Sequence, residues 1–174
     1  PSGFVFRKEA HVYRAIGPAY AADFEACERS GLHEELIRDR LLIPHRPAPP
    51  EITVPQGMWK VIHPRQIPYV SYPSEWCFGE LQEAALTTLE IQRRSMKKGF
   101  SMKDAAASNI QFLDGKAMLI DSLSLESLKT GRPWVAYRQF CEKFLAPLAL
   151  IATRDSRLGQ LSRIWPSGLP LEMV

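Results

Sequence analysis

The chain has 174 residues, of which 45% are hydrophobic, and 22 basic side chains against 19 acidic ones give it a net charge of +3. This length predicts one domain or one compact two-lobed unit with a sizeable core. The balanced charge, with no basic stripe of interleaved aromatic residues, argues against nucleic acid as a partner. No apolar run is long enough to span a membrane, and no signal peptide is recognised.

The cysteines and histidines give no metal-binding pattern. Cys27, Cys77 and Cys141 are far apart and form no CxxC or Cys/His spacing, so they predict reduced, partly buried thiols in a cytoplasmic protein. The four histidines are scattered along the sequence and indicate no zinc site. Because Pro1 is not a natural start, we expect the chain to be a piece of a longer protein.

The first seventy residues predict short strands and two helices. Strands are expected at 4–8 and 10–16, joined by a tight turn, and a helix at 19–29 carries Tyr20, Phe24 and Cys27 on one face. A second short helix at 32–39 precedes an extended piece at 41–43. The proline-rich segment 44–50 predicts a stiff connector without regular structure. Further strands are expected at 58–63 and 67–71.

The remainder predicts a helical half. Residues 71–76 form a proline-broken, aromatic-rich segment, and an apolar stripe predicts a long helix at 78–98 that Gly99 ends. Basic residues at 93–94 and 97–98 lie near that helix's C-terminus, where positive charge is favourable. A second long helix is expected at 134–151, kinked at Pro147, and a last one at 155–164. The core face of the helix at 134–151 is expected to hold Tyr137, Phe140, Cys141, Phe144 and Leu145.

A β-hairpin is predicted between these helices. Asp114-Gly115 is a dipeptide typical of two-residue type I′ turns, in which both central positions need positive φ. The apolar flanks 110–113 and 116–120 then form the two strands. With this turn Leu113 pairs with Lys116, and the ladder runs back from that pair to the open end of the hairpin.

Three polar residues gather at this open end. The register places Asn109 opposite Ile120, so Asp121 follows one residue later at a cross-strand distance of roughly 5 Å. Asp104 lies five residues upstream of Asn109, within reach through a short loop. Two carboxylates and a carboxamide bind Mg²⁺ and position a hydroxyl in phosphoryl transfer. The alternatives are a helix cap at Asp104, a turn residue at Asn109 and a helix cap at Asp121.

The order of elements resembles the protein-kinase-like fold, closest to its aminoglycoside-phosphotransferase-like branch. The resemblance implies a reduced, two-lobed α+β fold with a strand-rich lobe at 1–70, a hinge at 71–76 and a helical lobe at 77–174. It also implies that Asp104 accepts the proton of the substrate hydroxyl and that Asn109 and Asp121 hold Mg²⁺ against the phosphates of ATP.

The same resemblance implies a nucleotide pocket with weaker candidates. The hinge, with Tyr72 and Glu75, would line the adenine pocket, and Glu25 would be the partner of a strand residue. The chain departs from active kinases in three respects, the first being that Lys103, not arginine, precedes Asp104, with no histidine ahead of it. No glycine-rich phosphate loop precedes the second strand, and Arg14 stands where a kinase strand carries its lysine.

A more specific resemblance covers nearly the whole chain. It rests on SYPSEW at 71–76, DAAASNIQF at 104–112, IDSLS at 120–124 and PWVAYRQF at 133–140. These segments are similar to the N-terminal region of a bacterial family of class I SAM-dependent methyltransferases related to nodulation proteins of the NoeA type. In that family a methyltransferase domain follows this region. The ten glycines here never form G-x-G, so SAM is expected to bind only outside this chain.

Three functions follow from these observations, and whether the chain is itself an enzyme stays open. The first is a kinase-like accessory domain that precedes a methyltransferase domain and is either vestigial or nucleotide-binding. The second is an active Mg-ATP-dependent phosphotransferase acting on a sugar or another small molecule. The third is a structural interaction module. The expected partners are a nucleotide or small molecule and the C-terminal methyltransferase domain of the same chain.

Overall fold

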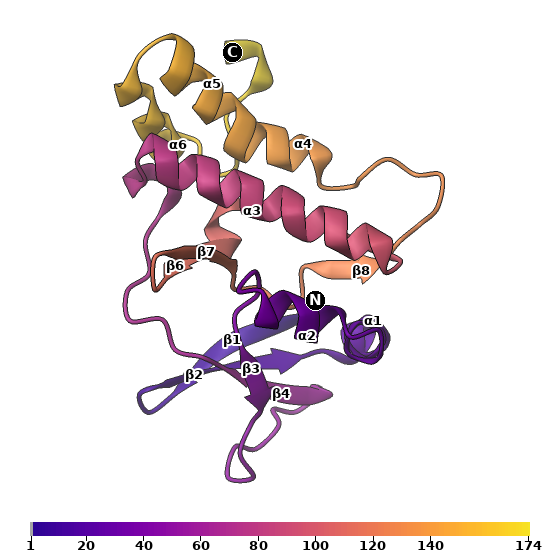
Figure 1. Cartoon of the computed structure of the whole chain (residues 1–174). Helices are drawn as coiled ribbons and strands as arrows, with labels where there is room; N and C mark the ends of the chain where they lie inside the picture. Colours follow the sequence, from indigo (N-terminus) through magenta and orange to yellow (C-terminus); the bar gives the residue numbers. More distant parts are fainter. Residues whose placement is uncertain (1) are drawn as a thin grey trace.

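A four-stranded antiparallel sheet lies below a mainly helical layer in the computed structural model, which describes residues 2–174 (Figure 1). The strand order is β1-β2-β4-β3, so β1 and β3 are the edges. The sheet strands are β1 Gly3–Lys8, β2 His11–Ile16, β3 His45–Pro47 and β4 Lys60–Pro64. The mixture of helices with antiparallel sheets confirms the predicted α+β class.

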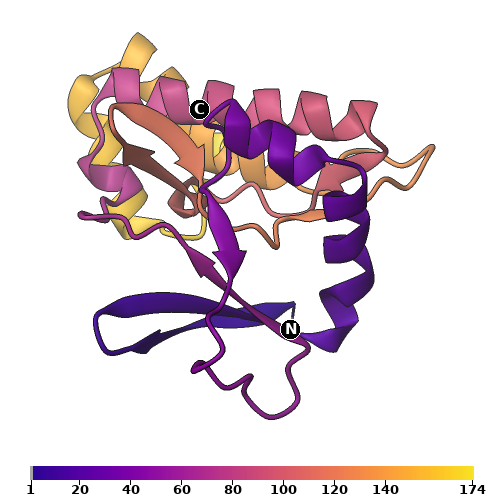
Figure 2. The same cartoon turned by 60° about the horizontal axis from the view of Figure 1, so that its bottom comes forward.

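Two helices connect the sheet to the helical layer. Helix α1 (Pro18–Arg29) stands between the two layers, and α2 (Leu32–Arg38) lies beside the long helix α3 (Phe78–Lys97), as Figure 2 shows. Gly31, at φ 69°, supplies the left-handed residue that separates α1 from α2. Leu32 and Leu36 are fully buried in the same core as residues of α3. The segment 1–70 therefore contributes to both layers.

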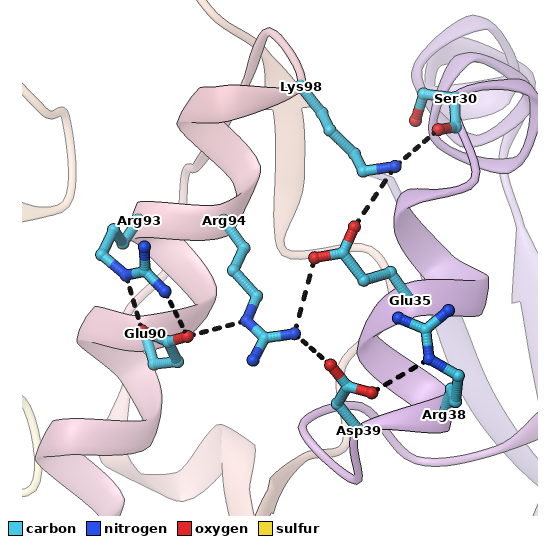
Figure 3. Close-up of polar contacts among 8 residues, drawn as sticks. All are labelled: Ser30, Glu35, Arg38, Asp39, Glu90, Arg93, Arg94 and Lys98. Atoms are coloured by element: carbon cyan, nitrogen blue, oxygen red, sulfur yellow. Dashed lines mark hydrogen bonds and ion pairs between the residues drawn. The ribbon is translucent and has the colours of Figure 1, made fainter.

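An ion-pair network adds to the packing of α2 against α3 (Figure 3). Arg94 contacts Glu90 on its own helix and reaches Glu35 and Asp39 at the end of α2. Lys98 pairs with Glu35 at 3.3 Å and donates to the carbonyl oxygen of Ser30. The basic cluster was expected to serve the C-terminus of its own helix, and the structure adds a tertiary role for it.

The helical layer contains α3, two small sheets and a long C-terminal helix. Helix α3 ends at Lys97, and Gly99, at φ 81°, follows its C-cap residue Lys98 and stops the helix, as predicted. Strand β5 pairs with β8, and β6 forms a hairpin with β7. The bounds are β5 Phe100–Met102, β6 Ile110–Leu113, β7 Lys116–Leu119, β8 Leu125–Ser127, α4 Tyr137–Phe140, α5 Ala146–Thr153 and α6 Leu161–Ile164. Strands β5 and β8 were not predicted.

Pro147 changes the helix around it in a specific way. The predicted helix at 134–151 begins at Tyr137, and its α4 and α5 parts are joined by a π-helical segment, Cys141–Leu145. Proline has no N–H, and its ring collides with the carbonyl four residues earlier in α geometry. The wider π turn before Pro147 relieves this conflict. Two residues expected on the core face, Tyr137 and Leu145, are exposed.

Four other interpretations of the sequence differ from the structure. The segment 44–50 contains β3, which is possible for a proline-containing strand because Pro47 lies on an edge, where not every residue must donate to a ladder. Residues 67–71 form no strand. Asp121 caps no helix, since β8 follows it, and the last predicted helix is mostly a 3₁₀ segment, Ser156–Gln160, before α6.

The cysteines are free thiols, as expected: Cys27 and Cys141 are buried and Cys77 is exposed. Across residues 2–174, no helix has both the length and the apolar character that crossing a membrane requires.

Candidate functional site

The β6–β7 hairpin has the predicted turn and register. Asp114 and Gly115 adopt φ values of 52° and 70°, which is the pair of left-handed conformations that a type I′ turn needs. Leu113 faces Lys116, and Ile110 faces Leu119. The open end of the hairpin therefore lies at Asn109.

Asn109 and Asp121 are neighbours at this open end. The backbone N–H of Ile120 donates to the carbonyl oxygen of Asn109 at 2.8 Å, which continues the ladder by one pair. The side-chain Nδ2 of Asn109 is buried and has no hydrogen-bond partner among the described residues. A buried amide without a partner is uncommon in folded proteins, so this carboxamide is open to a further contact.

Asp121 connects the hairpin to the four-stranded sheet. Its Oδ1 accepts from Arg14 Nη1 at 2.5 Å and from the backbone N–H of Leu123 at 2.8 Å. The side chains of Arg14 and Asp121 are only 14% and 22% exposed. Arg14 lies on β2 opposite Ile62 of β4, so the ion pair joins a central strand of the sheet to the end of the hairpin.

Asp104 follows β5. Unlike Asp121, which is held by the four-stranded sheet, it is held by residues of the helical layer. Its Oδ1 accepts from the backbone N–H of Ala106 at 3.0 Å and from Gln139 Nε2 at 2.8 Å. Gln139 in turn accepts from the backbone N–H of Ala105. Burial lowers the pKa of the nearby Lys143, and the charge of Asp104 opposes this shift. Asp104 is thus fixed from the helical layer, whereas Asp121 is fixed from the sheet.

Lys103, which precedes Asp104 in the chain, contacts the ring of Tyr20 on α1. Lys103 Nζ lies 4.1 Å from the centroid of the Tyr20 ring and donates to Ser2 Oγ. The Tyr20 hydroxyl donates to the carbonyl oxygen of Leu125 at 2.5 Å. Burial, reinforced by nearby negative charge that includes Asp121, raises the pKa of Tyr20 above its ordinary value. Tyr20 therefore stays a neutral donor.

The predicted hinge is held by a buried glutamine that the sequence analysis did not single out. Gln111 on β6 accepts from the backbone N–H of Ser71 and donates to its carbonyl oxygen, at 2.9 and 2.8 Å. Ser71 Oγ also accepts from Trp76 Nε1. A polar residue inside the apolar run 110–113 was the one signal in the sequence for this contact.

Tyr72 and Glu75 line a hollow of about 820 Å³. The wall opposite them includes Ser108, between Asp104 and Asn109, together with Lys143 and Trp165. Glu75 accepts from the backbone N–H of Tyr72, and the Tyr72 side chain is exposed. The hinge candidates therefore lie beside the loop between Asp104 and Asn109.

Glu25 is not brought to this site. It forms an exposed ion pair with Arg29 on α1 at 3.4 Å, and the partner of Arg14 is Asp121. The structure thus brings Arg14, Asn109 and Asp121 together, keeps Asp104 on the neighbouring loop, and leaves Glu25 on the outer face of α1.

Carboxylate and carboxamide oxygens, which Asp121 and Asn109 carry, are ligand types that Mg²⁺ accepts. Within the described part of the chain, no three or more His, Cys, Asp and Glu side chains form a metal-binding group. A Mg²⁺ ion would therefore need oxygens from a nucleotide phosphate as well, which is usual for this ion.

The chain is similar in sequence to a nodulation protein. It is 34% identical over 157 residues to the nodulation protein NoeA of Rhizobium meliloti (strain 1021), and this alignment covers 89% of the chain. The chain spans about a third of the length of NoeA, because the alignment covers 33% of that protein. No protein-family model matches the chain. The similarity supports the expected relationship to NoeA-like proteins of bacteria.

Proposed function

We propose that this chain is a kinase-like accessory region that binds a nucleotide and precedes a SAM-dependent methyltransferase domain in a longer protein. The observation that carries the proposal is the placement of Asn109 and Asp121 at the open end of a type I′ hairpin, with Arg14 of the sheet on Asp121. A carboxamide, a carboxylate and a guanidinium are groups that bind Mg²⁺ and phosphate. The similarity to a third of NoeA supports a region that belongs to a longer protein.

Each residue would have a distinct part in this site. Asp121 and Asn109 would hold Mg²⁺, and the ion would neutralise charge on the nucleotide phosphates. Arg14, freed from Asp121, would contact a phosphate through its planar guanidinium. Tyr20 would keep its donated hydrogen bond to Leu125 and so fix the spacing between α1 and β8.

An active phosphotransferase is the second candidate. It is favoured by the loop between Asp104 and Asn109, because Ser108 of that loop lines the 820 Å³ hollow. Both hydrogen bonds that the Asp104 side chain accepts use its Oδ1 atom. Its Oδ2 would then accept the proton of a substrate hydroxyl. A purely structural module is favoured by the same two contacts, since they hold Asp104 as a loop-fixing residue.

Thermal unfolding with Mg-ATP tests the nucleotide proposal. At ligand tenfold above Kd, binding only the native state should raise Tm by about 3–6 °C for a chain of this size. Asp121→Asn should abolish this shift, whereas Glu25→Gln, an exposed carboxylate outside the site, should retain it. An unchanged wild-type Tm at millimolar Mg-ATP would rule out both nucleotide functions and leave the structural module. SAM should give no shift with this chain.

Phosphoryl transfer needs a separate experiment. The chain would be incubated with Mg-ATP and a panel of sugars and other hydroxylated small molecules, and products would be followed by ³¹P NMR. Transfer that Asp104→Asn abolishes without changing the ATP-dependent Tm shift would establish the phosphotransferase. Nucleotide binding without any transfer is the outcome expected for an accessory region.

A further inference from the structure

All four histidines of the chain gather around the edge strand β3, although they are far apart in sequence. The rings of His33 and His45 are 5.5 Å apart between centroids, and those of His11 and His63 are 5.2 Å apart, both edge-to-face. The first pair lines a hollow of about 430 Å³ between helices α1 and α2 and strands β3 and β4. This hollow is separate from the site at Asp121.

His33 is the buried polar group of this hollow. Its side chain is 3% exposed, and neither ring nitrogen has a hydrogen-bond partner among residues 2–174. Burial, followed by the nearby His45 and Lys60, lowers the pKa of His33 to about 3. The ring is therefore neutral at pH 7, with one N–H to donate and one lone pair to accept. Buried polar groups nearly always have a hydrogen-bond partner. Two unpaired ring nitrogens at one buried histidine are therefore unusual, and they are available to a ligand.

Positive side chains surround the same hollow. Lys60 Nζ lies 5.2 Å from the centroid of the Phe24 ring and 3.4 Å from Glu28 Oε2, and the Glu28 side chain is 42% exposed. Arg38 and Arg46 also line the hollow, as do the carboxylates of Glu28 and Glu34. The guanidinium of Arg38 pairs with Asp39 at 3.0 Å. Arg46 forms no ion pair within the described part of the chain. The lining of the hollow thus carries three cationic side chains, Lys60, Arg38 and Arg46, against two carboxylates.

We propose that this hollow binds a phosphate group, either inorganic phosphate or the phosphate of a small phosphomonoester. The neutral ring of His33 donates its N–H to one phosphate oxygen, and Lys60 and Arg46 neutralise the charge. The volume lies within the range of small-ligand sites. A phosphate has three terminal oxygens and close to two negative charges, so it can accept from the His33 ring and from these cations at the same time.

NMR of the histidine rings tests the proposal directly. The intact chain, labelled with ¹⁵N, would be titrated at pH 7.5 with inorganic phosphate and, separately, with glycerol 3-phosphate. We expect saturable shifts of the His33 ring nitrogens in both titrations. Tighter binding of glycerol 3-phosphate would identify a phosphomonoester as the ligand, and equal or weaker binding would identify inorganic phosphate.

Variants separate this site from general charge effects and from the nucleotide site. Lys60→Met should weaken phosphate binding at least tenfold, whereas Lys129→Met, which removes a surface cation outside the hollow, should leave it unchanged. His33→Phe keeps an aromatic ring and should abolish the phosphate-dependent rise in Tm; Arg46→Gln provides a second test if that variant does not fold. Asp121→Asn should bind phosphate normally even if the nucleotide proposal fails.

Two results would overturn the proposal. The first is a His33 ring whose nitrogen shifts stay constant up to 50 mM of either ligand, as they would if a buried water satisfied it. The second is an equal loss of phosphate binding in Lys60→Met and Lys129→Met, which would indicate a nonspecific charge effect.

Discussion

Removing Arg14 is expected to destabilise the chain more than removing any exposed arginine. The Arg14–Asp121 ion pair is 2.5 Å long, and its side chains are 14% and 22% exposed. A hydrogen bond to a charged group is worth about 1.5–3 kcal/mol, while breaking a fully buried pair costs about 3–5 kcal/mol. Because this pair is only partly buried, we expect Arg14→Met to cost about 1.5–3 kcal/mol. That corresponds to a Tm lowered by about 3–12 °C.

The measurement is urea unfolding of a double-mutant cycle with Arg14→Met and Asp121→Asn. Asparagine keeps an oxygen that accepts from the Leu123 N–H, so the cycle isolates the interaction with Arg14. Arg29→Met is the matched control, because Arg29 is 70% exposed and its pair with Glu25 is 3.4 Å long. Exposed pairs of this kind contribute less than about 1 kcal/mol.

The reasoning would be refuted by equal losses of stability in Arg14→Met and Arg29→Met. It would also fail if the two mutations at the ion pair were additive within about 0.5 kcal/mol, since residues that do not interact behave in this way. An unchanged m-value across the cycle is needed for either comparison.

The remaining predictions concern a histidine, the thiols and the hairpin turn. The pKa of His33 in the folded state, about 3, lies below its ordinary 6.5, so its contribution to stability is present above pH 6.5 and lost as the pH falls toward 3. Urea unfolding between pH 6 and 4 should show a slope about 1.4 kcal/mol per pH unit steeper for wild type than for His33→Phe, and equal slopes would contradict this. Of the three thiols, only Cys77 should react with a thiol reagent in native buffer, because Cys27 and Cys141 are buried and burial raises the pKa of Cys27 to about 12; three fast thiols would be the contrary result. Gly115→Ala should cost about 1 kcal/mol in urea unfolding for its φ of 70° alone, since a Cβ there meets no described atom within 4 Å, and a neutral result would argue against the turn type.

Local signals in the sequence were enough to predict the hairpin and most helices. The Asp114-Gly115 turn set the register that places Asn109 beside Asp121, because a two-residue turn leaves one pairing. Helix α3 followed from its apolar stripe and from Gly99, which ends it. These features depend on residues close in sequence, so no knowledge of the tertiary fold was needed.

Features that depend on distant contacts could not be predicted in this way. Strand β3 contains Pro47 and has no strand signal of its own; it forms because β4 offers it an open edge. The pairing of Arg14 with Asp121 joins residues 107 positions apart. Periodicity also placed Tyr137 on the core face, but the helix begins only there, and its first turn leaves that ring in solvent.

The Arg14–Asp121 pair links stability to the proposed function. A metal ion held by Asp121 would compete with Arg14 for the charge of that carboxylate, so the contact that stabilises the ligand-free chain opposes metal binding on its own. A nucleotide phosphate changes this balance, because Arg14 can exchange the carboxylate for a phosphate oxygen while Mg²⁺ takes its place on Asp121. Mg²⁺ and nucleotide should therefore bind together more strongly than the product of their separate affinities, which is a positive coupling between the two ligands.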